Sequence, residues 1–173
     1  MIFWSVVLVG IIGVFVFFWL ISAGKLGFMP TFEELENPNN RFASEVYFAD
    51  GPIMNRYFEK ENRKYIEYRE IPQSVIDALI ATEDVRFYDH SGVDVRGLFR
   101  VAKGLLTANT SAGGGSTISQ QLAKMLFPRE SDLNVFELAI RKFREWVIAV
   151  RLEKSYTKEE ILTMYLNKYD FLN

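Results

Sequence analysis

The sequence predicts a mainly α-helical protein, in which a helical domain follows an N-terminal transmembrane helix and a short β-hairpin linker. Three observations predict it: an uncharged apolar run at the N-terminus, a helical period of apolar residues from Pro72 onward, and two aromatic, β-branched segments around an Asp-Gly turn. The chain has 173 residues, enough for one modest domain and an appendage. We therefore expect an anchor over residues 1–24, a juxtamembrane linker and hairpin over 25–70, and the helical domain over 71–173.

Composition excludes several functional classes. The net charge is -2 and the sequence pI is about 5.6, so no basic field attracts nucleic acid, and we expect no nucleic-acid partner. Cysteine is absent, which excludes disulfides and thiolate catalysis. His90 is the only histidine of the sequence, so a zinc site built on several histidines is also excluded.

The N-terminal run has the length and composition of a membrane span. Residues 1–24 carry no charge, and residues 2–21 match the length of about 20 apolar residues that crosses a bilayer. The run is too long for a cleaved signal peptide and lacks its basic start, which predicts an uncleaved anchor. Only Lys25 follows closely, so the charge-bias rule does not decide which side of the membrane the domain occupies.

A linker and a hairpin are predicted after the anchor. Residues 27–41 contain two prolines and several Asn and Glu residues, a composition typical of a spacer. Residues 44–48 and 54–58 are rich in aromatic and β-branched side chains and flank a turn at Gly51, which predicts a hairpin. We expect a third short strand over residues 64–68.

The first two predicted helices follow Pro72. One face of the first helix carries Val75, Ile76, Leu79 and Ile80. Asp94 can cap the second helix, which reaches Thr107 and whose apolar side consists of Val95, Leu98, Phe99, Ala102, Leu105 and Leu106. Basic residues lie between these positions, at Arg96, Arg100 and Lys103. Both a core helix and an element that handles lipid at a membrane surface fit this pattern.

Three further segments complete the domain. Residues 107–115 lack bulky side chains, which predicts a mobile loop, and a helix over 116–127 follows it. Asp132 can cap a long helix reaching about Lys154. Residues 157–160 match a capping box at the start of a last helix.

Two clusters of polar residues stand at the ends of these helices. The first is Glu83-Asp84-x-x-Phe87-x-x-His90-x-Gly92. Taken singly, such an acid is usually a solvated surface residue and such a histidine a structural one. The second is Gly114-x-Ser116-Thr117-x-x-Gln120-Gln121-x-x-Lys124, in which a glycine-rich loop enters a helix. Its free backbone N–H groups and Lys124 would suit an anion, although an ordinary capped helix looks the same.

Two more clusters lie on the later helices. Arg141-Lys142-x-x-Glu145 places two cations and a carboxylate on one side of a helix, as ordinary surface ion pairs also do. The fourth cluster, which alone predicts a capped amphipathic helix, is Lys158-x-x-Ile161-Leu162-x-x-Tyr165-x-Asn167.

Together, in this order and behind an anchor, the four clusters resemble the glycosyltransferase family 51 domain of class A penicillin-binding proteins, the peptidoglycan glycosyltransferases. The resemblance runs from about Ile71 to Asn167. It implies a lysozyme-like helical fold, lipid II and the growing glycan strand as substrates, and release of undecaprenyl pyrophosphate. It also implies a single-pass protein of the bacterial inner membrane with an extracytoplasmic catalytic domain. Its partners would be the lipid bilayer and other cell-wall synthesis proteins.

The resemblance assigns roles to the motif residues. Glu83 matches the family's catalytic base, and Glu145 matches its second essential glutamate. The other motif positions imply substrate binding by Asp84, Phe87, His90, Ser116, Thr117, Gln120, Gln121, Lys124, Arg141, Lys142, Lys158, Tyr165 and Asn167. The family's fifth motif would lie beyond Asn173, so we expect the domain to be C-terminally incomplete.

The chemistry explains why these residue types are needed. A sugar hydroxyl that attacks an anomeric carbon needs a base, and Glu83 would serve if it is partly desolvated. Departing pyrophosphate needs cations, which Lys124, Arg141 and Lys142 would provide. Glu145 could hold a divalent ion, Mg or Mn, on the pyrophosphate or orient these cations, and both roles stay open. The reaction requires no organic cofactor.

Two other functions fit a helical domain of this kind. A lytic glycosidase on a lysozyme-like fold would use Glu83 as a general acid to cleave glycan. The Arg141-Lys142 pair and the anchor argue against it, because a hydrolase needs no clamp for pyrophosphate. A non-catalytic membrane-anchored cell-wall scaffold is the other alternative, and the presence of both Glu83 and Glu145 argues against it.

Overall fold

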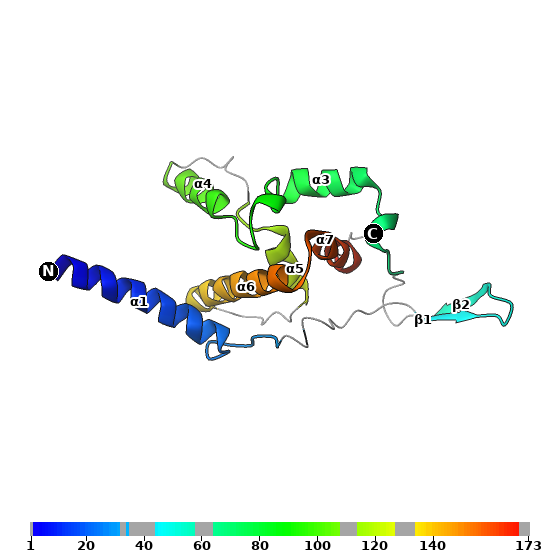
Figure 1. Ribbon diagram of the computed structural model, residues 1–173, viewed down its shortest axis with the longest axis horizontal. Coiled ribbons are helices and arrows are strands. Elements are labelled where there is room, and N and C mark those ends of the chain that lie inside the picture. Colours follow the sequence, from blue (N-terminus) through cyan, green and yellow to red (C-terminus); the bar gives the residue numbers. More distant parts are fainter. Residues whose placement is uncertain are drawn as a thin grey trace.

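The protein is mainly helical, as predicted (Figure 1). The computed structural model describes residues 2–31, 34, 44–57, 64–107, 114–126 and 134–169. Its helices are α1 (Ile2–Ser22), α3 (Gln73–Glu83), α4 (Val95–Leu106), α5 (Ile118–Leu126), α6 (Val135–Ser155) and α7 (Lys158–Lys168), with short 3-10 helices η1 (Tyr68–Glu70) and η2 (Phe87–Asp89).

Helix α1 is long and apolar enough to cross a membrane, judged by length and composition. Its C-terminal end packs against α6, where the rings of Phe17 and Phe18 lie 5.3 and 5.8 Å from that of Phe143. Arg151 of α6 donates to the carbonyl and hydroxyl oxygens of Ser22, both at 2.8 Å. Helix α1 is therefore joined to the helical body at α6.

The predicted hairpin is confirmed. Strand β1 (Ser44–Tyr47) pairs antiparallel with β2 (Ile53–Tyr57), and the turn uses Gly51 at a φ of 104°, a conformation that favours glycine. The third strand predicted over 64–68 is wrong. The backbone N–H and carbonyl of Ile66 bond instead to the side chain of Asn167, at 2.9 and 2.8 Å.

Helix α5 lies at the centre of the body and packs against both α6 and α7. The buried core that joins them consists of Ile71, Ile76, Phe87, Ile118, Leu122, Ala123, Ile148, Leu152, Ile161, Leu162 and Tyr165. Helix α3 contributes Ile76 to this core, whereas Val75 of the predicted face is 41% exposed. The core therefore fixes α3 and α5 relative to each other.

Helix α4 exposes much of its predicted apolar face. Val95, Phe99 and Leu106 are 58%, 73% and 89% exposed, whereas Leu98 is half-buried. The Asp94 cap is confirmed, because its Oδ1 accepts from the backbone N–H of Gly97 at 2.9 Å. Helix α4 is therefore capped as predicted but is not an ordinary core helix.

Caps explain where the other helices begin. Helix α5 begins at Ile118 because the hydroxyl of Thr117 accepts from the N–H of Gln120. The cap of α6 is Asn134 rather than Asp132, which lies outside the described residues. The capping box at Thr157 is confirmed. Most of the predicted mobile loop, residues 108–113, also lies outside the described part of the chain.

Candidate active site

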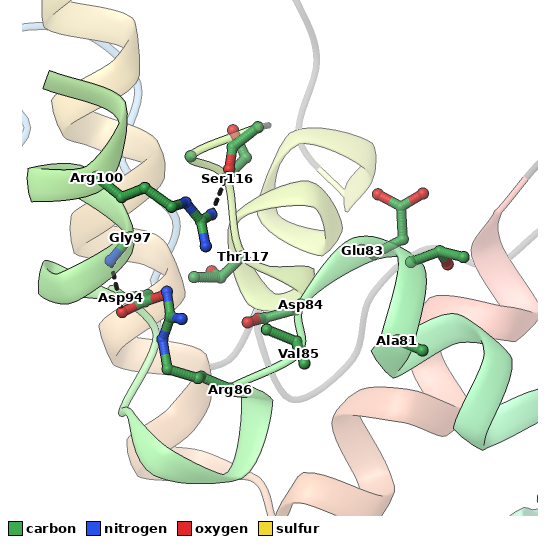
Figure 2. A pocket seen from close by; sticks show the side chains of 13 residues that line it. Ala81, Glu83, Asp84, Val85, Arg86, Asp94, Gly97, Arg100, Ser116 and Thr117 are labelled. Carbon is green, nitrogen blue, oxygen red and sulfur yellow. Dashed lines mark hydrogen bonds and ion pairs between the residues drawn. The ribbon is translucent and has the colours of Figure 1, made fainter. Parts of the chain in front are cut away.

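A cavity of about 310 Å³ lies between the end of α3, the start of α4 and the segment that enters α5. In Figure 2, Glu83 lies on one side of Thr117, and Arg86, Asp94 and Arg100 lie on the other. A carboxylate, two guanidinium groups and hydroxyls therefore share one opening, as general-base and anion-binding chemistry require.

Glu83 is the last residue of α3 and is held by a relay of polar side chains. The amide of Gln121 donates to Glu83 Oε2 at 2.7 Å, and the hydroxyl of Tyr165 donates to Gln121 Oε1 at 3.0 Å. Burial and the nearby Glu83 charge raise the pKa of Tyr165, so its hydroxyl keeps the proton that it donates. The side chain of Glu83 is exposed, so the partial desolvation on which its role as a base depends is not supplied by the protein alone.

Asp84, the next residue, is buried, and its side chain bonds to other partners than that of Glu83. It accepts from the backbone N–H of Ile118 at 3.1 Å, which ties the end of α3 to the start of α5. Both of its oxygens lie 3.1 Å from His90 Nε2. Because an ionised carboxylate only accepts, this Nε2 carries the proton. Asp84 and His90 therefore position the turn that presents Glu83.

Gly92 allows the loop after His90 to touch α6. Its φ is 92°, and a Cβ placed there would lie 2.7 Å from the backbone carbon of Ala149. Its carbonyl accepts from Thr117 Oγ1 at 2.7 Å and from Gln120 Nε2 at 3.1 Å. Only a glycine fits this contact, which joins the first two motif clusters.

Lys142 connects the second and third clusters. Its ammonium group donates to Ser116 Oγ and to Glu145 Oε2, both at 2.9 Å. Glu145 is buried, whereas Lys142 is half-buried. Because Ser116 lines the cavity, this triad places the Lys142 ammonium group at the edge of the cavity, with its charge balanced by Glu145.

Comparison with known proteins identifies the domain. A family model described as Transglycosylase matches residues 50–173. The chain belongs to the transglycosylase family. It is 39% identical to penicillin-binding protein 1A of Escherichia coli over 140 residues, which are 81% of this chain and 16% of that protein. It is also 39% identical to the Haemophilus influenzae protein of that name over 149 residues, 86% of this chain and 16% of the relative. Penicillin-binding protein 1A of Vibrio cholerae is 33% identical over 162 residues, which are 94% of this chain and 18% of the relative. The chain thus spans about a sixth of these relatives.

Two predicted cations of the transglycosylase domain are available to a ligand. Lys124 of α5 is exposed, and Arg141 of α6 is half-buried. Neither makes a hydrogen bond or ion pair with another residue in the part of the chain that the structure describes. Whether they bind substrate stays a prediction.

Several predicted substrate-binding residues of the transglycosylase domain are used inside the fold. Lys158 donates to the carbonyl of His90 at 2.7 Å and to Glu153 at 2.8 Å, and lies 4.2 Å above the ring of Phe87. Phe87 is fully buried, and Gln120 is 1% exposed. Asn167 bonds to the backbone of Ile66. These residues hold the site together, and their direct contact with substrate stays a prediction.

Glu145 does not form a metal site by itself. Among the described residues, no group of three or more His, Asp or Glu side chains could hold a metal ion. One Glu145 oxygen already accepts from Lys142. This contact suits a role in orienting the Lys142 ammonium group rather than in binding a metal ion. A divalent ion there would depend on oxygens of the pyrophosphate, and this role stays a prediction.

The structure adds an ion pair to the candidate site that the sequence did not indicate. Arg86 donates to Asp94 at 2.5 Å inside the cavity. Burial alone would raise the pKa of Asp94, but the bonds from Arg86 and from Gly97 N–H outweigh it and hold that pKa below its usual value. The same bond raises the pKa of Arg86. Arg86 occupies an unspecified position of the first cluster, so no spacing singled it out.

Proposed function

We propose that this transglycosylase chain is the anchored catalytic part of a peptidoglycan glycosyltransferase that polymerises lipid II into β-1,4-linked glycan strands. The observation that carries the proposal is the shared cavity. The carboxylate of Glu83 faces solvent on one side of this cavity, and Arg100 and Ser116, which is bound to Lys142, lie on the other side. The family description and the penicillin-binding names of the relatives support it. The likeness to a lysozyme fold stays a prediction.

Glu83 is the proposed general base. Gln121 occupies its Oε2, and within the described chain its Oε1 has no partner. That oxygen takes the proton of the acceptor's sugar 4-hydroxyl as the new bond to the anomeric carbon forms. A single displacement inverts the anomeric centre, so an α-linked donor yields a β-linked product.

The leaving side of the reaction depends on cations. As the bond from the anomeric carbon to the pyrophosphate oxygen breaks, its electron pair leaves with undecaprenyl pyrophosphate. Lys142, Lys124 and Arg141 neutralise that charge, and Glu145 keeps Lys142 beside Ser116. No acid is needed to protonate this leaving group.

The proposal places the domain at the outer surface of the inner membrane. Helix α1 is the single-pass anchor, and the lipid tail of the substrate keeps the cavity close to the bilayer. The exposed Val95, Phe99 and Leu106 of α4 support contact with the membrane surface, with Arg96 and Lys103 beside them.

Labelled lipid II tests this function. The full-length protein should convert it to a ladder of glycan polymers and release undecaprenyl pyrophosphate. Cleavage of preformed glycan without polymer would instead identify a lytic glycosidase. Binding of glycan or of other synthases, with neither reaction, would identify a scaffold.

A further inference from the structure

A second cavity, of about 480 Å³, lies where the end of α1 meets α6. It is lined by Phe18 and Ser22 of α1 and by Trp146, Val150, Arg151 and Lys154 of α6, among others. These α6 positions recur at helical spacing on the face turned away from Glu145 and the buried core. The cavity shares no lining residue with the candidate active site and is therefore separate from it.

The lining is apolar at its centre and cationic at one end. Phe18, Trp146 and Val150 supply apolar surface, and the described lining contains no acidic residue. Bonds to the carbonyl of Pro30 and to Ser22 hold Arg151 at the rim. Lys154 is exposed and has no hydrogen-bond or ion-pair partner in the described ranges.

Trp146 adds a polar group at this place. Its ring packs edge-on against Phe143 at 5.2 Å, while its indole N–H is buried and meets no acceptor among the described residues. Tryptophan is typical of the boundary between hydrocarbon and headgroups, where one side of the ring is apolar and the N–H seeks an oxygen. Ser22 is the last residue of α1, so the cavity lies at the level where the span would leave the hydrocarbon.

We propose that this cavity binds one phospholipid of the bilayer with an anionic headgroup. An acyl chain lies against Phe18, Trp146 and Val150, and the phosphate lies at Lys154 and Arg151. A volume of about 480 Å³ is within the range of about 300–1,000 Å³ that ligand sites occupy. The site rests on the proposed anchoring by α1 and does not depend on glycosyl transfer.

Fluorescence quenching by brominated lipids tests the site. The sequence has three tryptophans, so the variant Trp4→Phe/Trp19→Phe leaves Trp146 as the only one. The full chain is placed in nanodiscs that contain a small fraction of either dibromo-phosphatidylglycerol or dibromo-phosphatidylcholine. Phosphatidylglycerol should quench Trp146 at the lower mole fraction. Lys154→Gln should reduce this preference about fivefold, the factor expected for one cation near an anionic surface.

Lys25→Gln is the matched control, because Lys25 is exposed beside the same membrane surface but does not line the cavity. It should leave the preference unchanged, and Val150→Phe should reduce quenching by both lipids because it fills the cavity. Equal quenching by the two lipids, or an equal loss in Lys25→Gln, would overturn the proposal.

The variant Trp146→Phe, which keeps Trp4 and Trp19, reports insertion of α1. If Trp4 and Trp19 are quenched in this variant, while Trp146 is not quenched in Trp4→Phe/Trp19→Phe, the anchor stands and the lipid site fails. If they are not quenched, α1 is outside the bilayer and both proposals fail.

Discussion

Gln121 donates its amide N–H to Glu83 at 2.7 Å and thereby joins the second motif cluster to the proposed base of the first. The other end of the same amide accepts from the hydroxyl of Tyr165 at 3.0 Å. A carboxylate only accepts, and the raised pKa of Tyr165 keeps its hydroxyl a donor, so the amide has one favourable orientation. Because Tyr165 is buried in the core, the core itself positions Glu83.

Gln121→Leu should therefore lower the polymerisation rate about 10- to 100-fold. The loss corresponds to a hydrogen bond to a charged group, about 1.5–3 kcal/mol. The effect should be on kcat and on its pH profile, and it should come with a loss of stability of about 1–3 kcal/mol, because the buried Tyr165 hydroxyl also loses its acceptor. Gln73→Leu is a matched control, since that glutamine donates to Asp77 at 2.8 Å on the exposed side of α3. An equal loss of activity in both variants would contradict this positioning role.

Gly92→Ala should destabilise the fold. The backbone φ of 92° and the approach of a Cβ to within 2.7 Å of the Ala149 backbone together should cost about 3 kcal/mol. Chemical denaturation measures the change in the free energy of unfolding. Gly114→Ala should change it little, because no atom lies within 4 Å of a Cβ placed there. Similar values for the two variants would refute the close contact between this loop and α6.

The Arg86–Asp94 pair predicts a pH dependence of stability. The pKa of Asp94 is lower in the folded protein than in the unfolded chain, so its contribution is present above the unfolded pKa, about 4. That contribution is lost as the pH falls through the folded value. Asp94→Asn should therefore be less stable than the wild type at pH 7, and the difference should shrink toward pH 3. A difference in the free energy of unfolding that is constant over this range would count against the pair.

Lys142 and Arg141 should differ in their effect on folding. Lys142→Met leaves the buried Glu145 without its cation and should cost about 1–3 kcal/mol of stability as well as activity. Arg141→Met should lower polymerisation with little change in stability, because that side chain has no partner in the described chain. Denaturation and polymerisation of both variants test the contrast. Equal destabilisation by the two would show that Arg141 is also structural.

Local signals predicted the elements whose determinants lie close together in the sequence. The capping box at Thr157, the Asp94 cap and the turn at Gly51 each depend on residues within a few positions of one another, and all three are present. The family resemblance and the helical class are likewise confirmed.

What the sequence did not predict depends on contacts between distant segments. Lys158 meets the carbonyl of His90 across 68 positions, and Asn167 meets Ile66 across 101, so their motif spacing could not distinguish packing from substrate contact. Helical periodicity alone does not tell an exposed apolar face such as that of α4 from a buried one. The exposure of Glu83 likewise follows from where α3 ends relative to α5.

Removal of the acceptor's proton by Glu83 is tested most directly by one comparison. The full-length wild type and its Glu83→Gln variant are incubated with labelled lipid II in a membrane mimic, and the initial rate of polymer formation is measured. A glutamine retains the shape and can still accept from Gln121, but it cannot take a proton. We predict a rate at least about 100-fold lower with an unchanged melting temperature. Polymerisation by the folded variant at the wild-type rate would contradict the account.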